Sequence, residues 1–197
     1  MRVLVVYCHP SSDSFTHQVK EAFVKALESN GHQYVVSDLY AEGFNSVMSE
    51  SEYLREGYYQ CDTPVQEDVL REQKRINEAD AIVFIYPVFW TSSPAMLEGW
   101  FQRVWTYGYA YGDNRTMKTL DKALFLITMG GSLTEDLRQT QVEAMKTVMI
   151  GDRISDRARH AEFHVFDEMS RGEGNMENRL SRSITFLEKC NQLARDL

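Results

Sequence analysis

Five short apolar runs alternate with segments of helical periodicity, and this alternation limits the possible folds more than any other feature of the chain. The runs are rich in β-branched and aromatic residues and predict strands at residues 3–7, 34–37, 81–86, 123–128 and 161–166. No linker or low-complexity stretch divides them. Right-handed crossovers between parallel strands place helices on both faces of a sheet. The sequence therefore predicts a single α/β domain over residues 1–197, a three-layer sandwich with a five-stranded parallel sheet.

The helices are predicted from apolar spacing and from residues that begin or end a helix. Val19, Phe23 and Leu27 lie at helical intervals before a stop at Asn30-Gly31. Ser93 is a predicted N-cap with Pro94 at the first helical position. Further helices are predicted at residues 69–76, 134–149 and 176–197, the last with Leu180, Ile184 and Leu187 facing inward. Residues 38–63 show no sustained period and are interpreted as a long excursion, which in compact domains is usually functional or interfacial.

Composition and charge exclude several classes of protein. The 197 residues are 43% hydrophobic, which argues against disorder, and a net charge of −8 makes nucleic acid an unfavourable partner. Cys8, Cys61 and Cys190 have neither disulfide-framework nor zinc-site spacing, which favours a reducing compartment. The chain has no signal-peptide pattern and no apolar run long enough to span a membrane. We therefore expect a cytoplasmic protein without membrane insertion.

A parallel sheet of this kind binds its ligand at the carboxyl ends of its strands, beside the point where the strand order reverses. The first loop there, residues 8–17, delivers four hydroxyl side chains to a helix N-terminus, where free N–H groups favour an anion such as phosphate. The alternative is that these hydroxyls only cap the helix. Neither a dinucleotide-binding nor an NTPase glycine motif is present, and no arginine follows Cys8 as a cysteine phosphatase would require. Cys8 is therefore interpreted as a buried side chain.

The loops after the third and fourth strands complete a pattern that is more specific than any one loop. Residues 86–94 form an aromatic, apolar stretch suited to contact a planar ring, and Gly130-Gly131 allows close approach of backbone N–H donors. Either loop alone is a weak signal. A phosphate loop, an aromatic surface and a glycine turn at successive strand ends together fit a flavin.

The chain resembles the flavodoxin-like NAD(P)H:quinone oxidoreductases, the DT-diaphorase group and its bacterial relatives, over nearly its whole length. The matching motifs are His9 with Ser14-Phe15, residues 38–41, 72–74, 79–80 and 87–90, the run 94–104, and Thr128 with residues 130–132. The resemblance implies a flavodoxin-like fold and a homodimer with flavin sites at its interface. It also implies two-electron reduction of quinones by NADH or NADPH.

The cofactor implied is FMN, with FAD as the alternative, because only the adenylate half distinguishes them. In this interpretation Phe89 and Trp90 wall the flavin ring, whereas Thr128, Gly130 and Gly131 donate to its polar edge. The full set of predicted cofactor-binding residues is His9, Ser14, Phe15, Thr16, Pro87, Val88, Phe89, Trp90, Thr128, Met129, Gly130 and Gly131. Two interpretations are open for Tyr107, Tyr109 and Tyr111. They cover the substrate pocket of the partner subunit, or they form a structural aromatic cluster.

The sequence departs from the family at the positions of its charge-stabilising residues. The family's mammalian members carry a Tyr and a His shortly after the Gly-Gly turn, and the corresponding positions here are Asp136 and Val142. We therefore assign no catalytic residues to this chain from the family's Tyr and His. His160 and His164 do not form a known metal motif, so no metal is predicted.

Three other functions remain open at this point. An azo- or nitro-reductase uses the same flavin chemistry. Some relatives of the family are regulatory subunits of potassium-efflux systems. A one-electron flavodoxin carrier is a further alternative, although such a carrier does not need the excursion at residues 38–63.

Overall fold

The predicted strands form one sheet in which every neighbouring pair runs parallel. The computed structural model describes residues 1–172 and 175–197. The strands are β1 (Arg2–Tyr7), β2 (Gln33–Asp38), β3 (Ala81–Pro87), β4 (Leu120–Thr128) and β5 (Ala158–Phe166), in the order β2-β1-β3-β4-β5. The chain leaves β1 toward β2 and returns to β3 on the other side of β1. The direction of winding therefore reverses between β1 and β3, which places the ligand crevice there.

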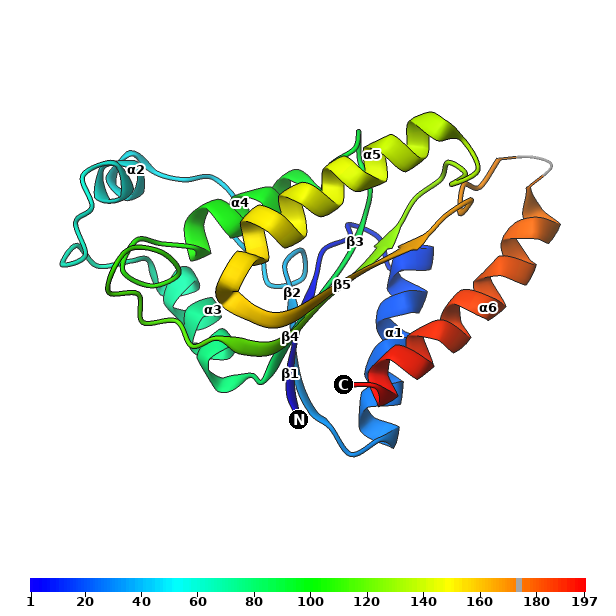
Figure 1. Cartoon of the computed structure of the whole chain (residues 1–197), viewed down its shortest axis with the longest axis horizontal. Helices are drawn as coiled ribbons and strands as arrows, with labels where there is room; N and C mark the ends of the chain where they lie inside the picture. Colours follow the sequence, from blue (N-terminus) through cyan, green and yellow to red (C-terminus); the bar gives the residue numbers. More distant parts are fainter. Residues whose placement is uncertain (173–174) are drawn as a thin grey trace.

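Helices cover both faces of the sheet, as predicted. Figure 1 shows α1 (Phe15–Ser29) and α6 (Met176–Arg195) side by side on one face, with α3 (Glu67–Glu78), α4 (Ala95–Val104) and α5 (Asp136–Lys146) on the other. Alternate residues of β1 face the two layers: Val3 and Val5 pack in the core with α1 and α6, whereas Leu4 and Val6 pack in the core with α3 and α4. The three-layer α/β sandwich is confirmed, and the extent of the domain, residues 1–197, stays a prediction.

The excursion contains a helix that was not predicted, α2 (Glu50–Gly57). It begins with a capping box, in which the Ser49 side chain accepts from the Glu52 N–H and the Glu52 carboxylate accepts from the Ser49 N–H at 2.7 Å. The Ser-x-x-Glu signal was present in the sequence. It was missed because few apolar residues follow it at helical spacing.

Two of the predicted helices differ in detail. Ser93 does not cap α4: Pro94 occupies the N-cap position, and the Ser93 hydroxyl donates to Glu98 at 2.8 Å. The helix predicted at residues 134–149 is α-helical only over Asp136–Lys146 and continues as a π-helical turn, Thr147–Ile154.

The inward face predicted for the last helix was wrong at two of its three positions. Leu180 and Ile184 are 67% and 56% exposed, whereas Cys190 and Leu193 are buried and Leu187 is partly buried against the core. Among the helices of the described residues, none is long and apolar enough to cross a membrane.

The aromatic face of α4 packs inward. Trp100 and Phe101 are 0% and 1% exposed, Trp105 is also buried, the three rings contact one another, and Trp100 and Phe101 also contact Phe84. The Trp100 indole N–H donates to the buried Glu72 carboxylate at 2.9 Å, which also accepts from Ser37 at 2.7 Å. This face is therefore the core of the single chain and is not available as a dimer surface.

Arg103 connects the helix of the excursion to the helices α3 and α4 that cover the sheet. Its side chain, 2% exposed, donates from Nε to Glu52 at 2.7 Å and from Nη2 to Asp68 at 3.0 Å. Burial by itself raises the pKa of Glu52, but hydrogen bonds from Ser49 and Arg103 outweigh it, so the pKa lies below its ordinary value. Burial by itself also raises the pKa of Asp68. The hydrogen bond and the charge of Arg103 outweigh it, so the pKa of Asp68 is lowered as well. One guanidinium thus holds α2, α3 and α4 together.

Replacing Arg103 by Met should lower the free energy of unfolding by about 3–5 kcal/mol at pH 7, because two carboxylates lose their buried counter-charge. Lowered carboxyl pKa values stabilise the fold above the ordinary values of 4.5 and 3.8, and this contribution is lost as the pH falls through the folded-state values. The variant should therefore lack this part of the acid dependence. Urea unfolding at pH 7 and below pH 4.5 measures both effects.

The matched control is Arg2→Met, since Arg2 pairs with Glu78 on the surface with both side chains more than a third exposed. Its cost should stay within about 1 kcal/mol. An equal cost for the two variants would contradict the anchoring role of Arg103.

Candidate active site

A cavity of about 320 Å³ lies at the carboxyl ends of β1, β3 and β4, where the winding of the sheet reverses. Ten of the twelve predicted cofactor-binding residues line it: His9, Ser14, Phe15, Thr16, Pro87, Val88, Phe89, Thr128, Met129 and Gly130. Trp90 and Gly131 do not. The three loops singled out by sequence therefore meet in one cavity.

The first loop uses its hydroxyls within the protein. Ser14 is the N-cap of α1 and its hydroxyl oxygen accepts the His17 N–H at 3.0 Å, so Ser14 caps the helix, while its role toward a phosphate stays a prediction. Thr16 and Thr128 share a buried hydrogen bond of 2.7 Å between their hydroxyls. The first-turn N–H groups of Phe15 and Thr16 have no intrahelical acceptor. These backbone donors, together with the O–H of Ser14, are available to an anion.

His9 is a neutral donor at the mouth of this loop. Burial lowers its pKa, with a smaller contribution from the charge of Arg171. Its Nδ1 accepts the Ser11 N–H at 2.9 Å and so carries no proton. The proton therefore resides on Nε2, and His9 lines the cavity as a hydrogen-bond donor without a charge.

The second loop makes a tight turn that holds Trp90 away from the cavity. Phe89 and Ser92 exchange two backbone hydrogen bonds of 2.9 and 3.0 Å across Trp90 and Thr91. Both central residues have positive φ, 50° and 62°, a conformation that usually requires Gly or Asn. Trp90 is fully exposed and Phe89 is 46% exposed. In the single chain, Phe89 and Val88 line the cavity and Trp90 lies outside it.

The third loop is joined to the loop after β5. Met129 donates to Phe166 and accepts from Met169, each at 3.0 Å, and Glu168 donates to the Gly131 carbonyl at 3.0 Å. A Cβ on Gly131 would lie 2.7 Å from Nε of Arg138. The group that packs against Gly131 is therefore the side chain of Arg138, which a larger residue at position 131 would displace.

Sequence reasoning missed four lining residues that follow the fifth strand: Met169, Ser170, Arg171 and Arg179. Arg171 donates to the Asp13 carbonyl, and Nε of Arg179 is buried without a hydrogen-bond partner in the described residues. The two arginines give a positive lining to a cavity in a chain of net charge −8. The signal was two arginines after the fifth strand, a loop that the prediction did not include.

A second cavity of about 300 Å³ adjoins the first and shares Phe15 and Arg179 with it. Met176 and Leu180, each 67% exposed, give it an apolar wall. Its polar lining residues are Gln18, Glu177 and Ser183. Together the two cavities pair a basic, donor-rich pole with an apolar extension.

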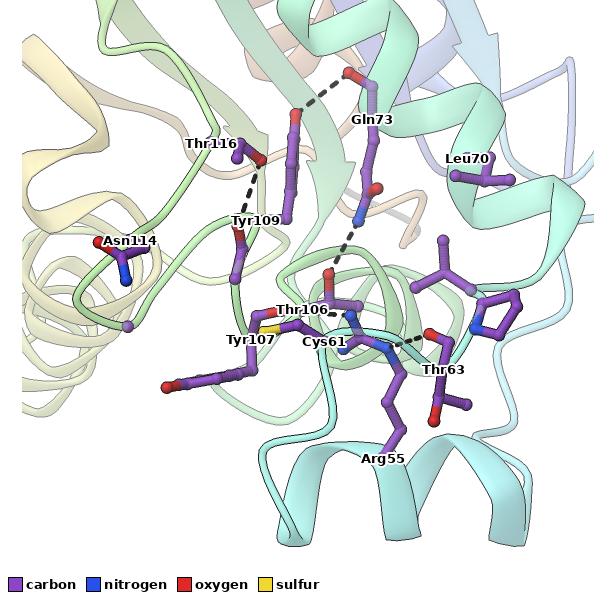
Figure 2. A pocket seen from close by; sticks show the side chains of 14 residues that line it. Arg55, Cys61, Thr63, Leu70, Gln73, Thr106, Tyr107, Tyr109, Asn114 and Thr116 are labelled. Carbon is purple, nitrogen blue, oxygen red and sulfur yellow. Dashed lines mark hydrogen bonds between the residues drawn. The ribbon is translucent and has the colours of Figure 1, made fainter.

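Another cavity, of about 540 Å³, lies elsewhere, between residues 55–73 and residues 106–116 (Figure 2). Arg55 donates there to the carbonyls of Thr63 at 2.9 Å and Tyr107 at 3.2 Å. The Tyr109 hydroxyl donates to the Gln73 carbonyl at 3.1 Å, and its ring is buried. Its lining comes from the excursion after β2, from α3 and from the segment between α4 and β4, and not from the loops after β1, β3 and β4. For Tyr109, the structural aromatic cluster is the role that the contacts support.

The structure also places the residues that the sequence analysis considered for other chemistries. Cys8 is fully buried, and burial raises the pKa of its thiol to about 12, so it is not a thiolate nucleophile. Asp136 is exposed and Val142 is buried in the core, so neither replaces the family's Tyr and His. Among residues 1–172 and 175–197, no three His, Cys, Asp or Glu side chains are grouped as metal ligands would be.

Comparison with known proteins gives the same architecture. A solved NAD(P)H:quinone oxidoreductase from Methanothermobacter marburgensis is 38% identical, covers 100% of this chain and 96% of its own, and superposes with a TM-score of 0.91. NAD(P)H dehydrogenase [quinone] 1 of Rattus norvegicus is 36% identical over an alignment of 152 residues. The alignment covers 66% of this chain and 54% of the rat protein. The match thus spans about half the length of that relative.

A more distant structure, an FMN-dependent NADH-azoreductase from Bacillus anthracis in complex with FMN, is 16% identical with a TM-score of 0.70, covers 98% of this chain and 99% of its own, and supports the fold alone. The family model described as "Flavodoxin-like fold" matches residues 1–151. With the strand order and the cavity at the β1/β3 reversal already in place, this match shows that the chain belongs to the flavodoxin-like fold family.

Proposed function

We propose that this protein is a flavin-dependent NAD(P)H:quinone oxidoreductase that reduces quinones or related acceptors by two electrons. The observation that carries the proposal is the cavity at the β1/β3 reversal, which combines backbone donors, two arginines and an apolar wall. The 38% identical M. marburgensis quinone oxidoreductase, matched along the whole chain, supports the same activity. An azo- or nitro-reductase is the alternative that the same site serves.

The residues of the cavity fit a flavin. The unpartnered Nε of Arg179 and the first-turn N–H groups of Phe15 and Thr16 suit its phosphate. Val88 and Phe89 offer an apolar surface for the ring, and Gly130 lines the cavity at the glycine turn proposed to face the polar edge of the flavin. When bound, the flavin accepts a hydride from NAD(P)H and supplies it to the acceptor. The protein orients the ring, excludes water from one face and leaves one opening for both substrates, which predicts ping-pong kinetics.

We further propose that the cofactor is FAD, which differs from the FMN preference drawn from the sequence. The second cavity shares Arg179 and Phe15 with the first, and its apolar wall of Met176 and Leu180 suits an adenine ring. FMN would leave these apolar side chains in water. FMN remains the alternative.

We also propose that the protein is a homodimer with its sites at the interface. The aromatic face of α4, from which the sequence suggested a dimer, is buried in the single chain. Other aromatics are exposed instead: Tyr53, Tyr58 and Tyr59 of the excursion are 64%, 69% and 64% exposed, and Trp90 is fully exposed at the rim of the cavity. Exposed apolar groups gathered on one segment are typical of a contact surface.

The purified protein should be yellow, and NADH or NADPH should bleach its flavin band under nitrogen. The cofactor released by heat should have the mass of FAD, and initial rates with menadione should give parallel double-reciprocal lines, since both substrates use one opening. A protein that is colourless and takes up neither FMN nor FAD would remove the proposed function. FMN in the released fraction would overturn only the cofactor assignment.

Replacing Arg179 by Gln should lower flavin affinity at least tenfold, because a hydrogen bond to a charged group contributes about 1.5–3 kcal/mol. The melting temperature of the apoprotein should barely change. Ser14→Ala should show the opposite pattern, with about 1 kcal/mol lost from the apoprotein and little change in flavin affinity. Arg195→Gln removes the same charge from the exposed end of α6 and serves as the control. If Arg195→Gln weakens flavin as much as Arg179→Gln, net charge rather than the cavity explains the loss.

Light scattering at low micromolar concentration should give twice the 22.8 kDa of the chain. Tyr58→Ser should increase the monomer fraction, because it removes an exposed aromatic ring from the proposed contact surface. Ile184→Ser, in α6, which lies on the opposite side of the fold from α2 (Figure 1), should leave the mass unchanged. A mass of one chain for the unaltered protein would rule out the dimer.

A further inference from the structure

Arg138 occupies the space that a side chain at Gly131 would fill. It lies in the first turn of α5, seven residues after Gly131. A Cβ on Gly131 would lie 2.7 Å from its Nε and 3.3 Å from its Cζ. The absence of a side chain at position 131 therefore lets a guanidinium pack directly against the glycine turn.

This guanidinium has hydrogen-bonding capacity that the protein does not use. Nη1 donates to Gln141 at 2.9 Å, whereas Nε is buried and has no hydrogen-bond partner among the described residues. The nearest carboxylate, Glu135, stands 3.6 Å from Nε, too far for a hydrogen bond, and its side chain is 58% exposed. The Arg138 side chain as a whole is 40% exposed, so an acceptor from outside the chain can reach its guanidinium.

The position also carries other positive potential. The N-terminus of α5 begins at Asp136, and its free N–H groups add to the charge of Arg138. Arg171 and Arg179 line the cavity from the loop after β5 and from α6. Arg138 approaches the glycine turn from α5.

We propose that Arg138 stabilises the negative charge that develops at the polar edge of the flavin during two-electron reduction. This inference rests on the proposed function, which places the Gly130-Gly131 turn at that edge. In the family, a Tyr and a His stabilise this charge, and Asp136 and Val142 stand at their positions here. We assign the charge-stabilising role to Arg138 instead.

The charges balance without a proton from Arg138. A hydride, one proton with two electrons, leaves NAD(P)H as NAD(P)⁺ and adds one net negative charge to the cofactor. The guanidinium remains protonated throughout. Its contribution is a fixed positive charge near the place where the new charge appears, which favours the reduced over the oxidised cofactor.

The test compares Arg138→Gln and Arg138→Lys with Lys146→Gln. Lys146 lies on the same helix eight residues further along, about 12 Å away, and pairs with Glu143, so its replacement changes the net charge equally. For each variant we would measure the midpoint potential of the bound flavin against a reference dye, the affinity for oxidised flavin, and the apoprotein melting temperature.

Arg138→Gln should bind oxidised flavin within about threefold of the unaltered protein. The preference for reduced over oxidised flavin should fall at least tenfold, which lowers a two-electron potential by about 30 mV. Arg138→Lys should recover most of the shift, and Lys146→Gln should show none. Gly131→Ala, whose methyl group displaces the guanidinium, should shift the potential in the same direction.

An unchanged potential in Arg138→Gln would overturn the inference. So would a loss of apoprotein stability alone, which would make Arg138 an anchor of the turn. A change confined to the KM for NADPH relative to NADH would also overturn it, because Arg138 would then bind the phosphate of the co-substrate. If the unaltered protein binds no flavin, the proposed function itself fails, and the two failures are thereby distinguished.

Discussion

The reversal of winding between β1 and β3 is the constraint on which the rest of the structure depends. Parallel strands must return to the same edge through crossovers, so the loops after β1, β3 and β4 open on one side of the sheet. At the reversal the helices diverge to opposite faces, and α1 covers one side while α4 covers the other (Figure 1). The gap that they leave is the cavity. The Thr16–Thr128 hydrogen bond, 2.7 Å long and buried, joins its two walls.

Sequence predicted the features that depend on neighbouring residues and missed those that depend on tertiary contacts. Strand positions and loop order follow from local apolar patterns, and both were confirmed. Spacing alone does not tell which apolar stripe of a helix faces inward: α6 carries Leu180 and Ile184 on one stripe and Cys190 and Leu193 on another, and only packing decides between them. The same ambiguity made the buried face of α4 look like an interface. Arg138 and Arg179 gain importance only from what lies beside them in space.

The charge at the cavity is opposite in sign to the net charge of the molecule. The chain carries −8, yet the cavity is lined by Arg171 and Arg179, and Arg138 packs behind its glycine turn. A local positive potential inside a negative protein concentrates anionic ligands at one place and discourages polyanions elsewhere. Phosphate-bearing cofactors and co-substrates match this pattern, and a nucleic acid backbone does not. The Nε atoms of Arg138 and Arg179, which have no hydrogen-bond partner among the described residues, are donors that a bound anion would satisfy.

Residues with strained backbone conformations lie in the loops beside the same cavity. Among the described residues, five non-glycine residues have positive φ, and three of them, Trp90, Thr91 and Glu168, lie in the loops that border the site. Each such residue costs roughly 1–3 kcal/mol and persists only where its surroundings enforce it. Glu168 is held by its bond to Gly131 and by the hydroxyl of Ser132. Trp90 and Thr91 are held by the two backbone hydrogen bonds between Phe89 and Ser92, whereas the Trp90 side chain is fully exposed in the single chain and adds no packing. The proposed dimer or the proposed flavin would each cover this indole beside the cavity, and either contact would add the side-chain packing that the single chain does not supply.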